Sequence, residues 1–127
     1  MKKSEVLLKL EKFKKALNKL EDAVKIAKDD LDRDGVIQRF EFTFELFWKT
    51  LKAILDYHGI ECYSPRDCIK KAFRYGILDD IDIFFDMLED RNLTSHTYDE
   101  ALSKEIFERI RNIYVKVFRN LNLEEKI

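Results

Sequence analysis

Hydrophobic side chains recur every three or four residues along most of this chain, which is the spacing of one helix face. The first stripe predicts a helix that begins near Ser4 and carries, on one side, Val6, Leu10, Phe13, Leu17, Leu20, Val24, Ala27 and Leu31. An acidic segment at residues 29–35 interrupts this pattern. A second stripe predicts a helix over residues 36–58 whose apolar face holds Ile37, Phe40, Phe44, Phe47, Leu51 and Ile54. The two helices are expected to form a long antiparallel hairpin.

A short third helix is bounded by residues that favour helix ends. Gly59 should end the second helix in the left-handed conformation. Ser64 and Pro65 suit the first positions of the next helix, which should stop at Gly76. The side chains expected to point inward from it are Ile69, Ala72 and Phe73.

Two further helices complete the expected fold. The fourth should start at Asp79 and end within residues 91–95, burying Ile81, Phe84, Phe85 and Leu88. Thr97 and Glu100 are spaced as a capping box for the fifth, whose apolar stripe is Leu102, Ile106, Ile110, Ile113, Val117 and Leu121. The pattern therefore predicts an all-α, up-and-down helical bundle of four main helices plus one short helix, with residues 1–127 as one domain.

The predicted second helix is apolar on two sides. Its second apolar side consists of Phe42, Leu46, Ala53 and Tyr57. A polar band along one edge separates the two sides and contains Gln38, Glu41, Glu45, Lys49 and Lys52. Either this helix lies at the centre of the bundle, or its second side binds a partner. Trp48 and the phenylalanines are expected to serve core and interface rather than to stack on bases.

Composition supports a helical protein and narrows its partners. Only three glycines and one proline interrupt the chain, while 46% of its residues are hydrophobic and 39% are charged. The formal net charge is −1, so any RNA binding must come from a local cluster of basic residues. The basic residues of the fifth helix alternate with acids and are expected to form a solvated face: Lys104, Arg109, Arg111, Lys116 and Arg119.

The two cysteines, Cys62 and Cys68, are too few for the disulfide framework of a secreted protein, so reduced structural thiols are expected. Too few ligands accompany them for a zinc site. No apolar run reaches membrane-spanning length, and the first residues do not resemble a signal peptide. We therefore expect a cytoplasmic protein that has no membrane segment.

Residues 90–98 contain the candidate chemistry. Arg91 and His96 lie five residues apart at the expected end of the fourth helix, where both side chains can reach one anion. Arginine gives phosphate a permanently charged planar donor, and histidine can move protons near neutral pH. Asn92 adds a neutral donor beside them. This set suits metal-independent cleavage of a phosphodiester by an internal hydroxyl. The ordinary structural alternative pairs Arg91 with Glu89 or Asp90 and leaves His96 near a helix cap.

The order Arg91-Asn92, then His96 after four intervening residues, then Tyr98 resembles the motif of HEPN ribonucleases. A second block at residues 38–49, QRFEFTFELFWK, resembles the second helix of the nucleotidyltransferase substrate-binding proteins in that family. The resemblance covers nearly the whole chain. It implies a helical bundle and a homodimer whose two-fold axis brings both Arg–His motifs into one cleft.

For function, the resemblance implies a toxin that cleaves RNA without a cofactor or metal. Its candidate catalytic residues are Arg91, His96 and Asn92. The implied partner is a minimal nucleotidyltransferase, the antitoxin, which silences the toxin by transferring AMP to Tyr98. The alternative within the same family is a non-catalytic subunit that presents a substrate to the nucleotidyltransferase.

A calcium site is a competing interpretation of residues 30–41. This stretch has acids at positions one, three and five of an EF-hand loop, Gly35 at the sixth and Glu41 at the twelfth. EF-hands usually occur in pairs, however, and the sequence has no second loop of this form. The acids can instead form the hairpin turn, with Asp34 capping the second helix.

Overall fold

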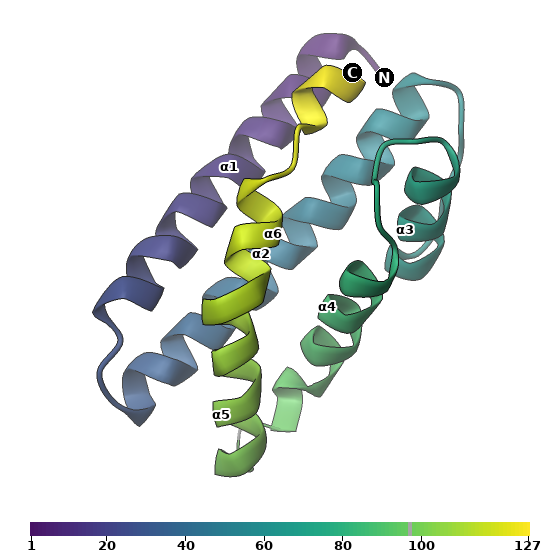
Figure 1. Cartoon of the computed structure of the whole chain (residues 1–127). Coiled ribbons are helices and arrows are strands. Elements are labelled where there is room, and N and C mark those ends of the chain that lie inside the picture. Colours follow the sequence, from purple (N-terminus) through teal and green to yellow (C-terminus); the bar gives the residue numbers. More distant parts are fainter. Residues whose placement is uncertain (97) are drawn as a thin grey trace.

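The structure, a computed structural model, describes residues 1–96 and 98–127, and that part of the chain is helical and has no strand. Figure 1 shows long antiparallel helices from the N-terminal half of the chain, helices from its C-terminal part that pack across them, and shorter helices at the side. The helices are α1 (Lys3–Ile26), α2 (Asp30–Tyr57), α3 (Pro65–Arg74), α4 (Asp82–Leu93), α5 (Glu100–Arg109) and α6 (Val115–Arg119). Both chain ends lie at the same end of the bundle (Figure 1). The predicted all-α helical bundle is confirmed.

Aromatic rings tie the helices together at the centre of the core. Phe47 of α2 stacks on Phe84 of α4 with ring centroids 5.2 Å apart, and it also contacts Phe118 of α6 at 5.2 Å. Phe13 of α1 meets Phe118 edge-on at 5.4 Å. Each such pair contributes about 0.5–1.5 kcal/mol beyond the burial of its area. These contacts fix α4 against the hairpin, and α4 is the helix that ends at the candidate site.

The connection between α1 and α2 is shorter than predicted. The carboxylate of Asp29 accepts a hydrogen bond from the backbone N–H of Asp32 at 2.9 Å, so Asp29, not Asp34, caps α2. Gly35 lies inside α2, because one glycine weakens a helix by only about 1 kcal/mol. The calcium-loop interpretation of residues 30–41 is therefore wrong. In a helix, acids two residues apart project about 200° from each other instead of converging on one ion.

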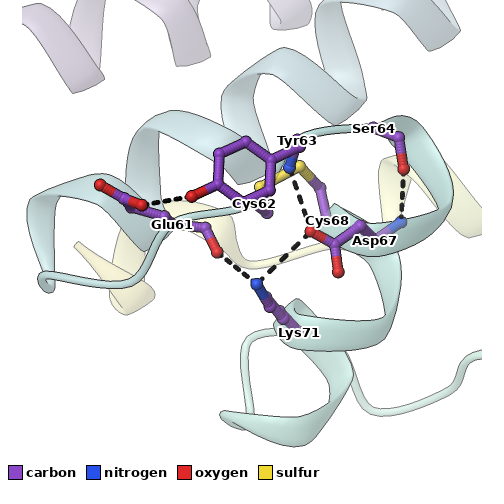
Figure 2. Close-up of a disulfide and its surroundings, with 7 residues drawn as sticks. All are labelled: Glu61, Cys62, Tyr63, Ser64, Asp67, Cys68 and Lys71. Atoms are coloured by element: carbon purple, nitrogen blue, oxygen red, sulfur yellow. Dashed lines mark hydrogen bonds and ion pairs between the residues drawn. A yellow bond between two sulfur atoms is a disulfide. The ribbon is translucent and has the colours of Figure 1, made fainter.

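The connection between α2 and α3 contains a disulfide, which corrects the prediction of reduced thiols. The sulfur atoms of Cys62 and Cys68 are bonded (Figure 2), and both side chains are buried. The chain folds back at the start of α3, where Ser64 accepts a hydrogen bond from the Asp67 N–H at 3.1 Å as its predicted cap. This turn brings the two Cα atoms to 5.1 Å, within the range that a disulfide spans.

Both glycine helix ends are confirmed, since Gly59 and Gly76 have left-handed backbones with φ of 81° and 77°. Phe73 was predicted to point inward and is instead exposed. The buried face of α3 is centred on Cys68 and Ala72, and Phe73 falls outside it.

The fourth helix begins three residues later than predicted, at Asp82 rather than Asp79. Ile77 and Leu78 are buried and anchor the preceding segment in the core. The Asp80 carboxylate then accepts a hydrogen bond from the Asp82 N–H at 3.1 Å, which satisfies one of the free donors at the start of the helix.

The predicted fifth helix is interrupted by a π-helical turn, η2 (Ile110–Tyr114), between α5 and α6. The wider turn adds a residue to the repeat, so Tyr114 rather than Ile113 enters the core, and Ile113 is 42% exposed. At the start of α5 the observed cap is Asp99, which accepts from the Leu102 N–H at 3.1 Å. The predicted capping residue Thr97 lies outside the described residues.

The two-sided character of α2 is only partly explained by its central position. Ala53 is buried and Leu46 packs against the core, as expected for a central helix. Phe42 is 62% exposed and Tyr57 is also exposed. The α2 surface thus keeps apolar side chains that nothing in the described chain covers.

Candidate functional site

Arg91 lies in the last turn of α4 and pairs with an acid distant in sequence. Its Nη2 donates to Oε2 of Glu45 on α2 at 2.8 Å, and its Nη1 donates to Oδ1 of Asn92 at 3.3 Å. The alternative prediction, in which Arg91 pairs with Glu89 or Asp90, is wrong. The pairing holds the guanidinium in one orientation against α2, and both partners remain about one-third exposed.

Glu45 joins several groups beside Arg91. Trp48 donates its indole N–H to Oε2 at 3.0 Å, and the Lys49 ammonium lies 3.4 Å from Oε1. Partial burial alone would raise the pKa of Glu45, but the Trp48 hydrogen bond and the charges of Arg91 and Lys49 outweigh it and lower that pKa. Glu45 is therefore an anion that orients a cation on each side.

His96 and Tyr98 form a second pair beyond the end of α4. The chain passes from α4 into a 3-10 turn, η1 (Thr94–His96), and the Thr94 hydroxyl donates to the Arg91 carbonyl at 2.6 Å. Nδ1 of His96 lies 2.8 Å from the Tyr98 hydroxyl, and the rings meet edge-on. Tyr98 is 80% exposed and His96 is also exposed. Both side chains can therefore be reached by a large substrate.

The sequence interpretation missed a buried polar network next to Arg91. Asp90 is 5% exposed and accepts hydrogen bonds from Nε and Nη2 of Arg109 at 2.7 and 2.8 Å, and from the hydroxyl of Tyr114. The hydrogen bond to Asp90 raises the pKa of Arg109 above its ordinary value. Burial, then the bond to Asp90, raises the pKa of Tyr114. Arg109 therefore fixes α4 to α5 and does not belong to the solvated face that was expected.

The position of Asp90 in the sequence indicates part of this network. Asp90 lies on the same stripe of α4 as the buried Met87, three residues earlier, so its carboxylate had to find partners in the core. Its main partners come from α5 and η2, where the π-helical turn carries Tyr114 inward. That turn is the part the sequence did not predict.

The structure joins Arg91 to Asn92 and His96 to Tyr98 by hydrogen bonds, and the η1 turn that follows α4 ends at His96. A fixed cation, a neutral amide and a titratable imidazole can together bind a phosphodiester and move a proton. Among the described residues, no three His, Cys, Asp or Glu side chains are grouped as a metal site would require. No helix in the described part of the chain is long and apolar enough to cross a membrane.

Comparison with known proteins identifies a family, a relative of known name and a similar solved structure. Residues 8–126 match the model of the family described as "Nucleotidyltransferase substrate binding protein like". A Haemophilus influenzae protein named "Probable ribonuclease HepT" is 31% identical over 87 residues, which cover 65% of this chain and 60% of that protein. The chain thus spans less than two thirds of that relative's length. A solved structure from Thermus thermophilus is 37% identical, with a TM-score of 0.75 over 90% of this chain and 93% of that one.

Proposed function

Because the chain belongs to the nucleotidyltransferase substrate binding protein like family, in the HepT-like HEPN group, we propose that it is a toxin of a toxin–antitoxin pair. Its activity is metal-independent endoribonucleolytic cleavage as a homodimer. The observation that carries the proposal is the arrangement of an oriented Arg91 and an exposed His96 around one helix end. The name of the Haemophilus influenzae relative supports the same reaction class.

In the proposed reaction the ribose 2′-hydroxyl of RNA attacks the adjacent phosphorus. His96 takes the hydroxyl proton through Nε2, because Nδ1 faces the Tyr98 hydroxyl. The P–O5′ bond breaks, and the leaving oxygen receives a proton, so that a cyclic phosphate and a 5′-hydroxyl are produced. Arg91, assisted by Asn92, stabilises the charge that develops on the phosphoryl oxygens.

A homodimer supplies a second imidazole for the proposed reaction. Each protomer carries one Arg91 and one His96, whereas the reaction needs both a base and an acid. Two imidazoles in a shared cleft can divide these roles. The exposed Phe42, one helical turn before Glu45 on α2, supports a contact between protomers near this cleft.

The proposed antitoxin is a minimal nucleotidyltransferase that transfers AMP from ATP to the Tyr98 oxygen and releases pyrophosphate. Tyr98 supports this role because its hydroxyl is exposed and touches His96. The modification places a bulky anion where the RNA phosphate has to bind. This anion opposes cleavage by excluding and repelling the substrate.

We place this pair in the cytoplasm, where its RNA substrate is found. The Cys62–Cys68 disulfide is unusual for that compartment, although intracellular proteins of hyperthermophiles retain such bonds.

The second candidate function is a non-catalytic subunit that binds a substrate for the nucleotidyltransferase. The observation in its favour is that Glu45 already pairs with Arg91, which reduces the positive charge offered to a phosphate. The family description fits this role as well.

The two functions are separated by expressing wild type, Arg91→Ala and His96→Ala without the nucleotidyltransferase, while following growth and the integrity of cellular RNA. If the protein is a toxin, wild type arrests growth and degrades RNA, whereas the two variants do neither. Co-expression of a cognate nucleotidyltransferase then relieves the arrest. Mass spectrometry then finds AMP on the peptide containing Tyr98, and Tyr98→Phe stays unmodified. If wild type leaves growth and RNA unaffected while all variants bind the nucleotidyltransferase, the binding subunit is the better account.

A further inference from the structure

A surface groove is lined by residues of α1 and α2, near the end of the hairpin where Met1 lies. Its volume is about 340 Å³. We call it the lysine groove, and the residues that line it are Met1, Lys9, Trp48, Lys49, Lys52, Ala53 and Asp56. A hydrogen bond from the Thr50 hydroxyl to the Lys9 carbonyl at 3.3 Å fixes the two helices side by side at this point.

The charge of the lysine groove is positive although the whole chain is not. Among the described residues, the ammonium groups of Lys9 and Lys52 have no acidic partner. Asp56, an acid that lines the groove, is paired with the Met1 ammonium at 3.4 Å. The groove is therefore the local basic cluster that an acidic chain needs in order to bind a polyanion.

The lysine groove is continuous with the candidate site through Glu45. The Glu45 carboxylate accepts from both Arg91 and the indole N–H of Trp48, at 2.8 and 3.0 Å, so Trp48 lies directly beside the Arg91 pair. From Glu45 to Lys52 the helix rises about 10 Å at 1.5 Å per residue. That length holds about three stacked nucleotides of one strand at about 3.4 Å each.

We propose that the lysine groove binds the single-stranded RNA that flanks the scissile phosphodiester, an inference that rests on the proposed function. Lys9 and Lys52 contact backbone phosphates, and Trp48 stacks on a base. Lysines that track a backbone beside an aromatic ring are how proteins bind single strands without sequence preference. A duplex hides its base faces, so the single strand is the form that this groove fits. Trp48 packs partly against the core and also lines the groove, so the proposed stacking adds to the core role that its sequence position suggested.

The test measures binding apart from cleavage, with a short labelled RNA whose 2′-hydroxyls are methylated so that it cannot be cut. Fluorescence anisotropy of Lys9→Gln/Lys52→Gln should show weaker binding than wild type. The slope of log Kd against log salt should fall by about 0.7 per lost phosphate contact, or about 1.4 for the pair. The matched control, Lys19→Gln/Lys25→Gln, removes the same charge from exposed positions of α1 and should bind as wild type does.

Trp48 is tested by a pair of substitutions that separates stacking from its hydrogen bond to Glu45. Trp48→Leu should weaken binding about 5- to 100-fold, the range for loss of one stacked base. Trp48→Phe keeps a ring without the N–H donor and should bind nearly as wild type. Thermal unfolding of both variants checks that the fold is intact.

The outcomes distinguish this inference from the proposed function. If wild type binds the RNA and the groove variants bind it equally well, the inference is overturned while the ribonuclease proposal stands. Failure of wild type to bind, or loss of nucleotidyltransferase binding or dimerisation instead of RNA binding, also overturns it. If the groove variants lose RNA binding but wild type does not cleave natural RNA, the groove stands and the ribonuclease proposal fails.

Discussion

Replacing Asp90 by asparagine should destabilise this protein more than any exposed charge substitution. The Asp90 carboxylate is buried and accepts two hydrogen bonds from Arg109 and one from Tyr114. An asparagine amide presents its own donors to the guanidinium and removes the negative charge. Charge-assisted hydrogen bonds contribute about 1.5–3 kcal/mol each. Since the Arg109 side chain is 37% exposed and can regain water, we discount the sum to about 3 kcal/mol.

Urea unfolding followed by circular dichroism measures this loss, and thermal unfolding should show a midpoint lower by about 10 °C. The matched control is Glu89→Gln, an identical charge change at the preceding, exposed position of α4. It should change the free energy of unfolding by less than about 0.5 kcal/mol. Equal stability of the two variants would refute the conclusion that the Asp90 network joins α4 to α5 and η2.

Three other predictions concern separate parts of the molecule. Glu45→Gln should lower the free energy of unfolding by about 1 kcal/mol at neutral pH. Because folding lowers the pKa of Glu45, urea unfolding should show this difference at pH values above the ordinary pKa of 4.5, and the difference should disappear as the pH falls through the lower pKa of the folded state. Cys62→Ser should destabilise by about 2 kcal/mol through loss of the Cys62–Cys68 link, and reducing wild type with dithiothreitol should have the same effect on the urea midpoint. Calorimetric titration with millimolar calcium should give no saturable heat, since residues 30–41 are helical, and stoichiometric binding would contradict that assignment.

The sequence predicted the helices well where a single periodic stripe and a strong end signal agreed. Ser64 and Pro65 start α3 as predicted, and the left-handed Gly59 and Gly76 end α2 and α3. The prediction failed at residues 29–35, where acids and a glycine look like a turn. The gain from extending a long, well-packed helix exceeds the weak preference of those residues for turns.

The partners of the candidate residues were beyond what spacing can show. Arg91 and His96 were located from their motif, but the acid that pairs with Arg91 is Glu45, 46 residues away. The register of Tyr114 depends on a π-helical turn, and the spacing of hydrophobic residues along the sequence does not predict such a turn. Long-range pairing and a one-residue register shift are set by tertiary packing rather than by local pattern.

The most direct test of the central claim is cleavage of RNA by purified protein in the presence of EDTA under single-turnover conditions. Wild type should cut an RNA strand and leave a cyclic phosphate, and it should not cut an oligonucleotide in which every ribose is deoxyribose. His96→Ala should be slower by about two to four orders of magnitude, while His58→Ala, which alters the chain's other histidine, should keep the wild-type rate. Intact RNA with wild type, or equal rates for the two histidine variants, would contradict the proposed mechanism.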